Sequence, residues 1–153
     1  MSLPIGDWEQ KVWGRTRCLA RNESNGVMVH VHQLEIKAGS WCSVHWHKAK
    51  TNLFICLSGK LRVVRLRGNS LTVDELYNKG SLLVPEREIH QFQALTDCEV
   101  VEEYRAPHPT QRFDEYDIIR LTEGNCDGVT TLEPKTFLLT NGAPWNGNIN
   151  SFR

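Results

Sequence analysis

This sequence has no excess of positive or of negative charge. Its 153 residues hold 18 lysines and arginines and 18 aspartates and glutamates, so the formal net charge at pH 7 is zero. A protein that holds a nucleic-acid backbone or an anionic membrane through electrostatics needs a field of positive charge, and this composition does not supply one. We therefore expect no nucleic acid and no membrane among the partners, and a small molecule as the ligand.

Long hydrophobic runs are absent as well. The longest uninterrupted apolar run is LFICL at 53–57, which is far shorter than the roughly 20 residues that a membrane-spanning helix needs. The first residues do not combine a basic segment with a hydrophobic signal core. Together these two features predict a cytoplasmic protein.

Cysteine pairs of the metal-binding and redox kinds are also missing. The chain has an odd number of cysteines, scattered and never in a CxxC pair: Cys18, Cys42, Cys56, Cys98 and Cys126. This distribution argues against a disulfide framework and against a cysteine zinc site. We expect five reduced thiols.

Helical periodicity, internal repeats and low-complexity tracts are absent too. Between residues 26 and 105 the sequence instead shows short extended runs separated by glycine, asparagine and aspartate, a pattern typical of all-β sandwiches and barrels. Two further extended pieces are expected at 116–121 and 136–140. The length favours one domain. We predict a single all-β domain over 1–153, with a barrel core at about 26–105, late strands at about 116–140 and short N- and C-terminal extensions.

The segment 30–37 alternates in the manner of a strand with one buried face. His30, His32, Leu34 and Ile36 fall on one side, since residues two apart in a strand share a face. The two histidines should therefore point inward, where we expect neighbouring groups to satisfy them rather than a second metal.

The stretch VHWH at 44–47 carries two histidines two positions apart. His45 and His47 would stand side by side on one strand face with their imidazoles converging, which is how a sheet presents two metal ligands. Lys48 and Lys50, rather than a carboxylate, follow them. Without a metal, these histidines would be polar residues in the mouth of a barrel.

The spacing around this stretch resembles the two cupin motifs. The first motif is matched by Gly39, five residues, the HxH pair, four residues, Asn52, six residues and Gly59, and the second by Gly80, Pro85 and His90. The resemblance implies a double-stranded β-helix (jelly-roll) barrel. It also implies one divalent metal ion, zinc, nickel, manganese or iron, held by His45, His47 and His90.

The glutamate position of the first motif is occupied by Asn52. An amide oxygen is a weaker, uncharged fourth ligand than a carboxylate. Either Asn52 completes the site with reduced affinity, or water takes the fourth place.

A closer resemblance is carried by the order of several segments. KVWG at 11–14, LEIKAG at 34–39, LSG at 57–59, VPEREIH at 84–90 and EYDIIRL at 115–121 follow one another as they do in the cupin domain of type II phosphomannose isomerases. The resemblance covers about 11–123. It implies a homodimer that isomerises a phosphorylated sugar, of the mannose-6-phosphate type.

Roles for individual residues follow from this resemblance. The isomerisation needs a base and an electrophile, and the metal would be the electrophile. Glu102 or His32 would be the base. Arg120 or Arg87 would hold the phosphate, because the planar guanidinium matches its oxygens, and His30 would also contact substrate.

Two departures from the family, both expected to fall beside the metal, leave other functions open. The family has an arginine after the second-motif histidine, where this chain has Gln91, and the glutamate is Asn52. One alternative is a three-histidine iron dioxygenase, which such a carboxylate-free ligand set suits. The other is a non-catalytic cupin that binds a carbohydrate or another small molecule.

Overall fold

A computed structural model describes residues 4–23, 26–114, 116–126, 128 and 135–148. These residues form strands, turns and loops, so none of them contributes a helix that could cross a membrane. The strands are β1 (Glu9–Lys11), β2 (Gly14–Asn22), β3 (Val29–Ile36), β4 (His45–Trp46), β5 (Thr51–Ser58), β6 (Leu61–Arg67), β7 (Ser70–Leu76), β8 (Ser81–Val84), β9 (Ile89–Ala94), β10 (Cys98–Arg105) and β11 (Ile119–Arg120). The all-β prediction is confirmed.

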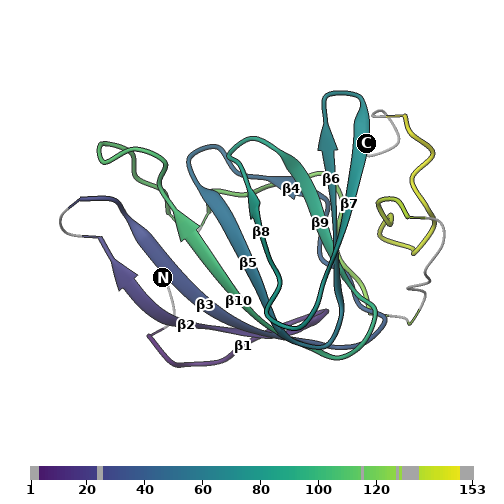
Figure 1. The fold of residues 1–153 in the computed structure, drawn as a ribbon, viewed down its shortest axis with the longest axis horizontal. Helices are drawn as coiled ribbons and strands as arrows, with labels where there is room; N and C mark the ends of the chain where they lie inside the picture. The colour runs from purple at the N-terminus through teal and green to yellow at the C-terminus, as the bar shows by residue number, and fades with distance from the viewer. Residues whose placement is uncertain (1–3, 24–25, 115, 127, 129–134, 149–153) are drawn as a thin grey trace.

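The strands form two antiparallel sheets. A six-stranded sheet has the order β1-β2-β3-β10-β5-β8, and a five-stranded sheet has the order β11-β4-β9-β6-β7. Figure 1 shows the first sheet from the left to the centre and the second at the right. Strands far apart in the sequence, such as β3 and β10 or β4 and β9, are neighbours. This arrangement confirms the predicted jelly roll.

The main core lies between the two sheets. It is built from alternate residues of β3, β5, β6, β9 and β10, including Leu34, Phe54, Val63, Phe92 and Val100. Burial of each such side chain contributes roughly 1.5–3 kcal/mol. In β3 the alternation is as predicted, with Leu34 and Ile36 buried at one end and the two histidines facing a cavity at the other.

Strands β1 and β2 extend the barrel beyond its predicted start at residue 26. β2 pairs with β3 along its length, yet of its nine residues only Gly14 and Cys18 are buried. Several residues of β2, among them Thr16, Arg17 and Arg21, line an open cavity instead of the hydrophobic core. For this reason β2 lacks the apolar alternation that marks a strand in a sequence.

The expected late strands are shorter than predicted. In the segment 116–121 only Ile119 and Arg120 form a strand, and in 136–140 only Leu138 forms a bridge, to Pro144. Part of the predicted range, 129–134, lies outside the described residues. The described part of the C-terminal segment packs its Phe137 against Val64 on the outer face of the five-stranded sheet.

Two buried glutamines of β9 explain why 136–140 is not a strand. Gln91 donates to the Leu138 carbonyl (2.9 Å) and accepts from the Leu138 N–H (2.8 Å), and Gln93 donates to the Thr136 carbonyl (2.8 Å). The side-chain amides therefore form hydrogen bonds with backbone N–H and C=O groups of 136–138. In a strand, these backbone groups would bond to a neighbouring strand instead. The segment is held flat against the sheet, away from the histidines.

The cupin-motif Gly59 closes the turn between β5 and β6, and it should not accept a side chain. Its φ is +82°, and a Cβ there would overlap the carbonyl oxygen of Asp97. We expect Gly59→Ala to lower the free energy of unfolding by about 3 kcal/mol or more, measured by urea denaturation. Gly68→Ala is the control, because Gly68 has a φ of +64° but open space around its Cβ. Equal losses in both variants would contradict the overlap.

Candidate metal centre

Three histidines from neighbouring strands form a buried cluster. His45 in β4 is the register partner of His90 in β9, and His47 follows directly after β4. The ring centroids are 5.0 Å apart for His45 and His47, 4.4 Å for His45 and His90, and 5.4 Å for His47 and His90. One ring nitrogen from each lies within 4.8 Å of the other two. The three predicted metal ligands are therefore brought together.

Backbone carbonyls fix how the three rings face. The Nδ1 atom of His45 lies 2.8 Å from the Ser43 carbonyl oxygen, that of His47 lies 2.6 Å from the Asp117 oxygen, and that of His90 lies 2.8 Å from the Glu88 oxygen. A carbonyl only accepts, so each Nδ1 carries the proton and each Nε2 keeps a free lone pair.

These lone pairs make the cluster suitable for a cation. The Nε2 atoms of His47 and His90 lie 3.2 and 3.4 Å from the same atom, Nδ2 of Asn52, so both face one point. Neutral imidazoles are good ligands for zinc, nickel and iron. The residues present fit one divalent metal ion held through three nitrogens.

Burial keeps the three rings neutral. It is the main cause that lowers the pKa of His45 well below its ordinary value, that of His47 to about 2 and that of His90 to about 4. Neighbouring positive charges act in the same direction. At neutral pH no proton has to leave these histidines before a metal binds.

Asn52 lies beside the cluster but presents its nitrogen to it. Its Nδ2 also donates to Oε2 of Glu102 at 3.1 Å, while Oδ1 is buried without a hydrogen-bond partner. In this orientation Asn52 is a donor to the site instead of the predicted fourth ligand. A half-turn of the amide would exchange the two atoms and point the oxygen at the histidines.

A second polar group of residues faces the histidines across the cavity. Glu102 in β10 is the register partner of His32 in β3, and its side chain is buried. Burial raises the pKa of Glu102 to about 7, against the lowering effects of a hydrogen bond from Tyr104 and the charge of Lys50. Burial, with nearby positive charges, lowers the pKa of His32 to about 4.

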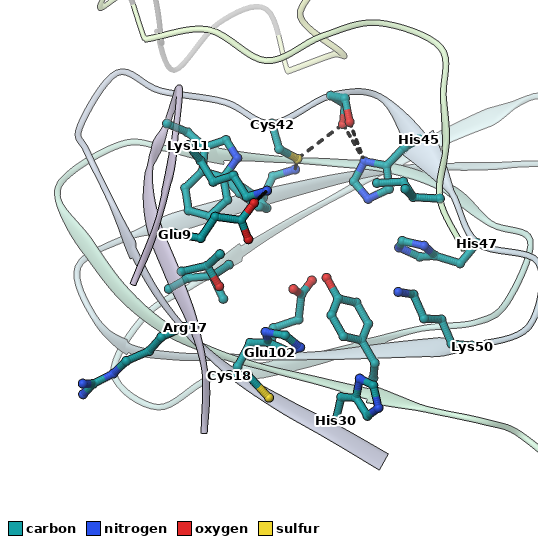
Figure 2. A pocket seen from close by; sticks show the side chains of 18 of the residues that line it. Glu9, Lys11, Arg17, Cys18, His30, Cys42, His45, His47, Lys50 and Glu102 are labelled. Carbon is teal, nitrogen blue, oxygen red and sulfur yellow. Dashed lines mark hydrogen bonds and ion pairs between the residues drawn. The ribbon is translucent and has the colours of Figure 1, made fainter. Parts of the chain in front are cut away.

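A cavity of about 720 Å³ connects these groups. Its wall includes His30 and His32, His45 and His47, and Glu102. Figure 2 shows the labelled histidines, Lys50 and Glu102 around this hollow. The volume is in the range of small-molecule sites, which run from roughly 300 to 1,000 Å³.

The predicted substrate residues fall in three places. Arg120 lines the cavity and is the register partner of His45. His30 also lines it, with Nε2 2.7 Å from Glu23. Arg87 is different, because its side chain is exposed and is not part of the cavity wall. It adopts a φ of +67°, and its N–H donates to the His47 carbonyl.

The expectation that Gln91 falls beside the metal is wrong. Gln91 is on the outer face of β9, under the C-terminal segment, whereas His90 points into the barrel. Successive residues of a strand face opposite sides. The departure at Gln91 therefore concerns packing of the C-terminal segment and leaves the metal centre unchanged.

Three residues of the site were not predicted. Tyr104 hydrogen bonds with Glu102. The Asp117 carboxylate accepts from the N–H groups of Lys48 (2.8 Å) and Ala49 (3.0 Å), which fixes the loop after His47. Lys50 is buried in the cavity wall. Only Lys50 carried a signal, as a charged residue within the histidine motif.

All five cysteines are free, and Cys18 and Cys42 reach the cavity wall. Burial raises the pKa of the Cys42 thiol and that of Cys98, the latter to about 12. Deprotonated thiolates are the form that binds metals and attacks substrates. None of the five forms a disulfide in the structure, the reduced state stays a prediction, and Cys42 has the character of a packing residue.

Comparisons with solved structures find proteins of the same fold. No family model matches the chain, and no curated protein matches it. Among solved structures, oxalate decarboxylase of Bacillus subtilis at pH 4.6 matches with 19% identity and a TM-score of 0.61, over 75% of this chain and 30% of that one. A structure reported with the Mn(II) centres of the same enzyme matches with 19% identity and a TM-score of 0.62, over the same shares.

These matches show a cupin fold. At such identities they carry no activity across to this chain, which spans less than a third of the length of the neighbours. A resemblance to phosphomannose isomerases is not established by them. The three-histidine cluster itself could hold one divalent metal ion.

Removal of one ligand should empty the centre without unfolding the barrel. We expect about one metal ion per chain in the wild type and less than about 0.1 in His47→Ala, because two imidazoles hold a divalent ion far more weakly than three. Elemental analysis of protein purified without a tag or chelator gives the stoichiometry. The exposed loop residue His108 provides the control, His108→Ala. Full stoichiometry in His47→Ala would refute the assignment.

Restoring the motif carboxylate should strengthen the centre. We expect Asn52→Glu to bind zinc at least about 10-fold more tightly, because an anionic oxygen replaces a neutral amide beside the histidines. Competition with a chelating dye measures the affinity. Asn52→Gln matches glutamate in size without its charge. If the glutamine variant gained as much affinity, side-chain length rather than charge would be the cause.

Proposed function

We propose that this protein is a metal-dependent sugar-phosphate isomerase of the mannose-6-phosphate type. The observation that carries the proposal is a buried carboxylate, Glu102, on the wall of the same cavity as the three-histidine centre. A site that only bound a ligand would have no need of a buried proton acceptor next to its metal. The order of motifs shared with the isomerase family adds the substrate class.

Aldose–ketose isomerisation moves a proton between two adjacent carbons. A divalent metal on His45, His47 and His90 would supply the electrophile that polarises the substrate oxygens. Glu102 takes the proton from one carbon and returns it to the next. A pKa of about 7, raised by burial, suits a group that both accepts and releases a proton near neutral pH.

Other residues of the cavity complete the scheme. The Tyr104 hydroxyl hydrogen bonds with the Glu102 carboxylate and orients it. His32, opposite Glu102 on β3, is neutral at pH 7 and is the second candidate for the base. Arg120 binds the phosphate from β11, which pairs with the first strand of the metal motif.

The test is isomerisation of mannose 6-phosphate by protein loaded in turn with zinc, nickel, manganese and iron. Loss of the Glu102 carboxylate removes general-base catalysis, which is worth about 10²- to 10⁴-fold, so we expect Glu102→Gln to lower kcat by that factor while the metal stoichiometry is kept. Glu103→Gln is the control, because Glu103 lies on the opposite face of β10 and pairs with Arg105. Absence of fructose 6-phosphate with all four metals would refute the proposal.

A second candidate is a three-histidine iron dioxygenase. The observation that favours it is the candidate ligand set, which among the described residues consists of three neutral imidazoles and includes no carboxylate. Oxygen uptake by the iron-loaded protein with a panel of organic substrates would support it. Oxalate belongs in the panel, because the neighbouring structures are oxalate decarboxylases. Tight ligand binding without turnover would favour a non-catalytic cupin. The homodimer and the cytoplasmic location remain predictions.

A further inference from the structure

The ammonium group of Lys50 is buried in the cavity wall without a polar partner. The residue is 5% exposed. Its Nζ lies 3.8 Å from the centroid of the Tyr104 ring and 5.2 Å from that of Phe113. With the described residues it forms no hydrogen bond and no ion pair. An ammonium group carries three donors, so Lys50 has N–H groups available to a molecule in the cavity.

Positive charge gathers on this side of the cavity. Lys50 is in the loop between β4 and β5, and Figure 2 shows its side chain and that of His47 projecting into the pocket from the same side. After burial, the charge of Lys50 is the largest cause that lowers the pKa of His47. Arg120 adds a second positive charge close enough to lower the pKa of Lys50 itself, for which burial is the main cause.

Three carboxylates act on Lys50 through their charge, those of Glu102, Asp117 and Asp114, but none forms an ion pair with it. Asp114 accepts a hydrogen bond from the backbone N–H of Tyr116. Asp117 uses both carboxylate oxygens to accept from backbone N–H groups of the loop after His47. Glu102 accepts from the amide of Asn52. Burial of an ammonium group costs free energy unless a charged partner offsets it. The faces of the Tyr104 and Phe113 rings supply part of that compensation, and an anionic ligand would supply the rest.

We propose that Lys50 binds an oxyanion of the ligand, a phosphate or a carboxylate, next to the metal centre. This inference deepens the proposed function. The choice of phosphate as the anion rests on the proposed function, whereas the oxyanion site itself does not. The aromatic rings of Tyr104 and Phe113 hold the ammonium group from one side, and its donors face the cavity. Lys50 is thereby the specificity residue that selects anionic over neutral ligands.

The experiment compares anion binding by three metal-loaded proteins at constant ionic strength. Isothermal titration with inorganic phosphate and, separately, with acetate is done on the wild type, Lys50→Met and Lys48→Met. Methionine keeps the length of the side chain and removes its charge. A hydrogen bond to a charged group corresponds to about 10- to 100-fold in affinity, which is the loss expected for Lys50→Met. Lys48 is exposed, so Lys48→Met should stay within about 2-fold of the wild type.

A second measurement separates the binding role from a structural one. The charge of Lys50 opposes a cation at the histidines, so in anion-free buffer Lys50→Met should bind zinc roughly 3-fold or more tightly. A lysine that merely supported the loop would weaken zinc binding when replaced. Unchanged phosphate and acetate affinity in Lys50→Met would overturn the proposal, as would failure of the wild type to bind either anion.

The two anions also distinguish this proposal from the isomerase. Stronger binding of phosphate than of acetate supports a phosphorylated substrate. Stronger binding of acetate supports Lys50 as an oxyanion site and counts against a sugar phosphate. Lys50-dependent phosphate binding without any isomerisation of mannose 6-phosphate would keep the Lys50 site and end the isomerase proposal.

Discussion

Three hydrogen bonds from histidine Nδ1 atoms to backbone carbonyls are the interaction on which the rest of the site depends. Each fixes one tautomer, and together they leave three lone pairs facing one point. Two of the carbonyls are local, since Ser43 and Glu88 each lie two residues before the histidine they fix. The third comes from Asp117, 70 residues after His47. The late segment is thus part of the centre, although none of its residues is a ligand.

The same segments also place charge around the cluster. Glu88 orients His90 through its carbonyl, while its carboxylate accepts from Arg65 at 3.2 Å, and Arg65 is the register partner of His90. Asp74 holds the other side of Arg65 at 3.0 Å. A buried arginine is costly unless it is well paired. The ion pairs of Arg65 with Glu88 and Asp74 also hold the start of β9, where His90 lies.

The sequence was sufficient to predict the sheet class, the clustering of the three histidines and the inward face of β3, because each depends on a local period of two residues or a short motif. It did not reveal β1 and β2, since strands that border an open cavity instead of the core lack apolar alternation. It also placed Gln91 beside the metal, although Gln91 follows His90 directly in β9 and so faces the opposite side of the sheet. It gave Lys50 no role. Whether a charged side chain is buried depends on aromatic residues far away in the chain, here Tyr104 and Phe113.

The replacement of the motif glutamate by Asn52 changes the electrostatics of the whole cavity. Three imidazoles and an amide are all neutral, so a bound divalent ion would keep its full charge of two, where a carboxylate ligand would cancel part of it. The buried carboxylate of Glu102 is one hydrogen bond further away, held by the Asn52 amide itself. Lys50 adds another positive charge on the same side. A cavity with this distribution of charge is complementary to an anion, and the loss of the motif carboxylate and the burial of a lysine therefore act in one direction.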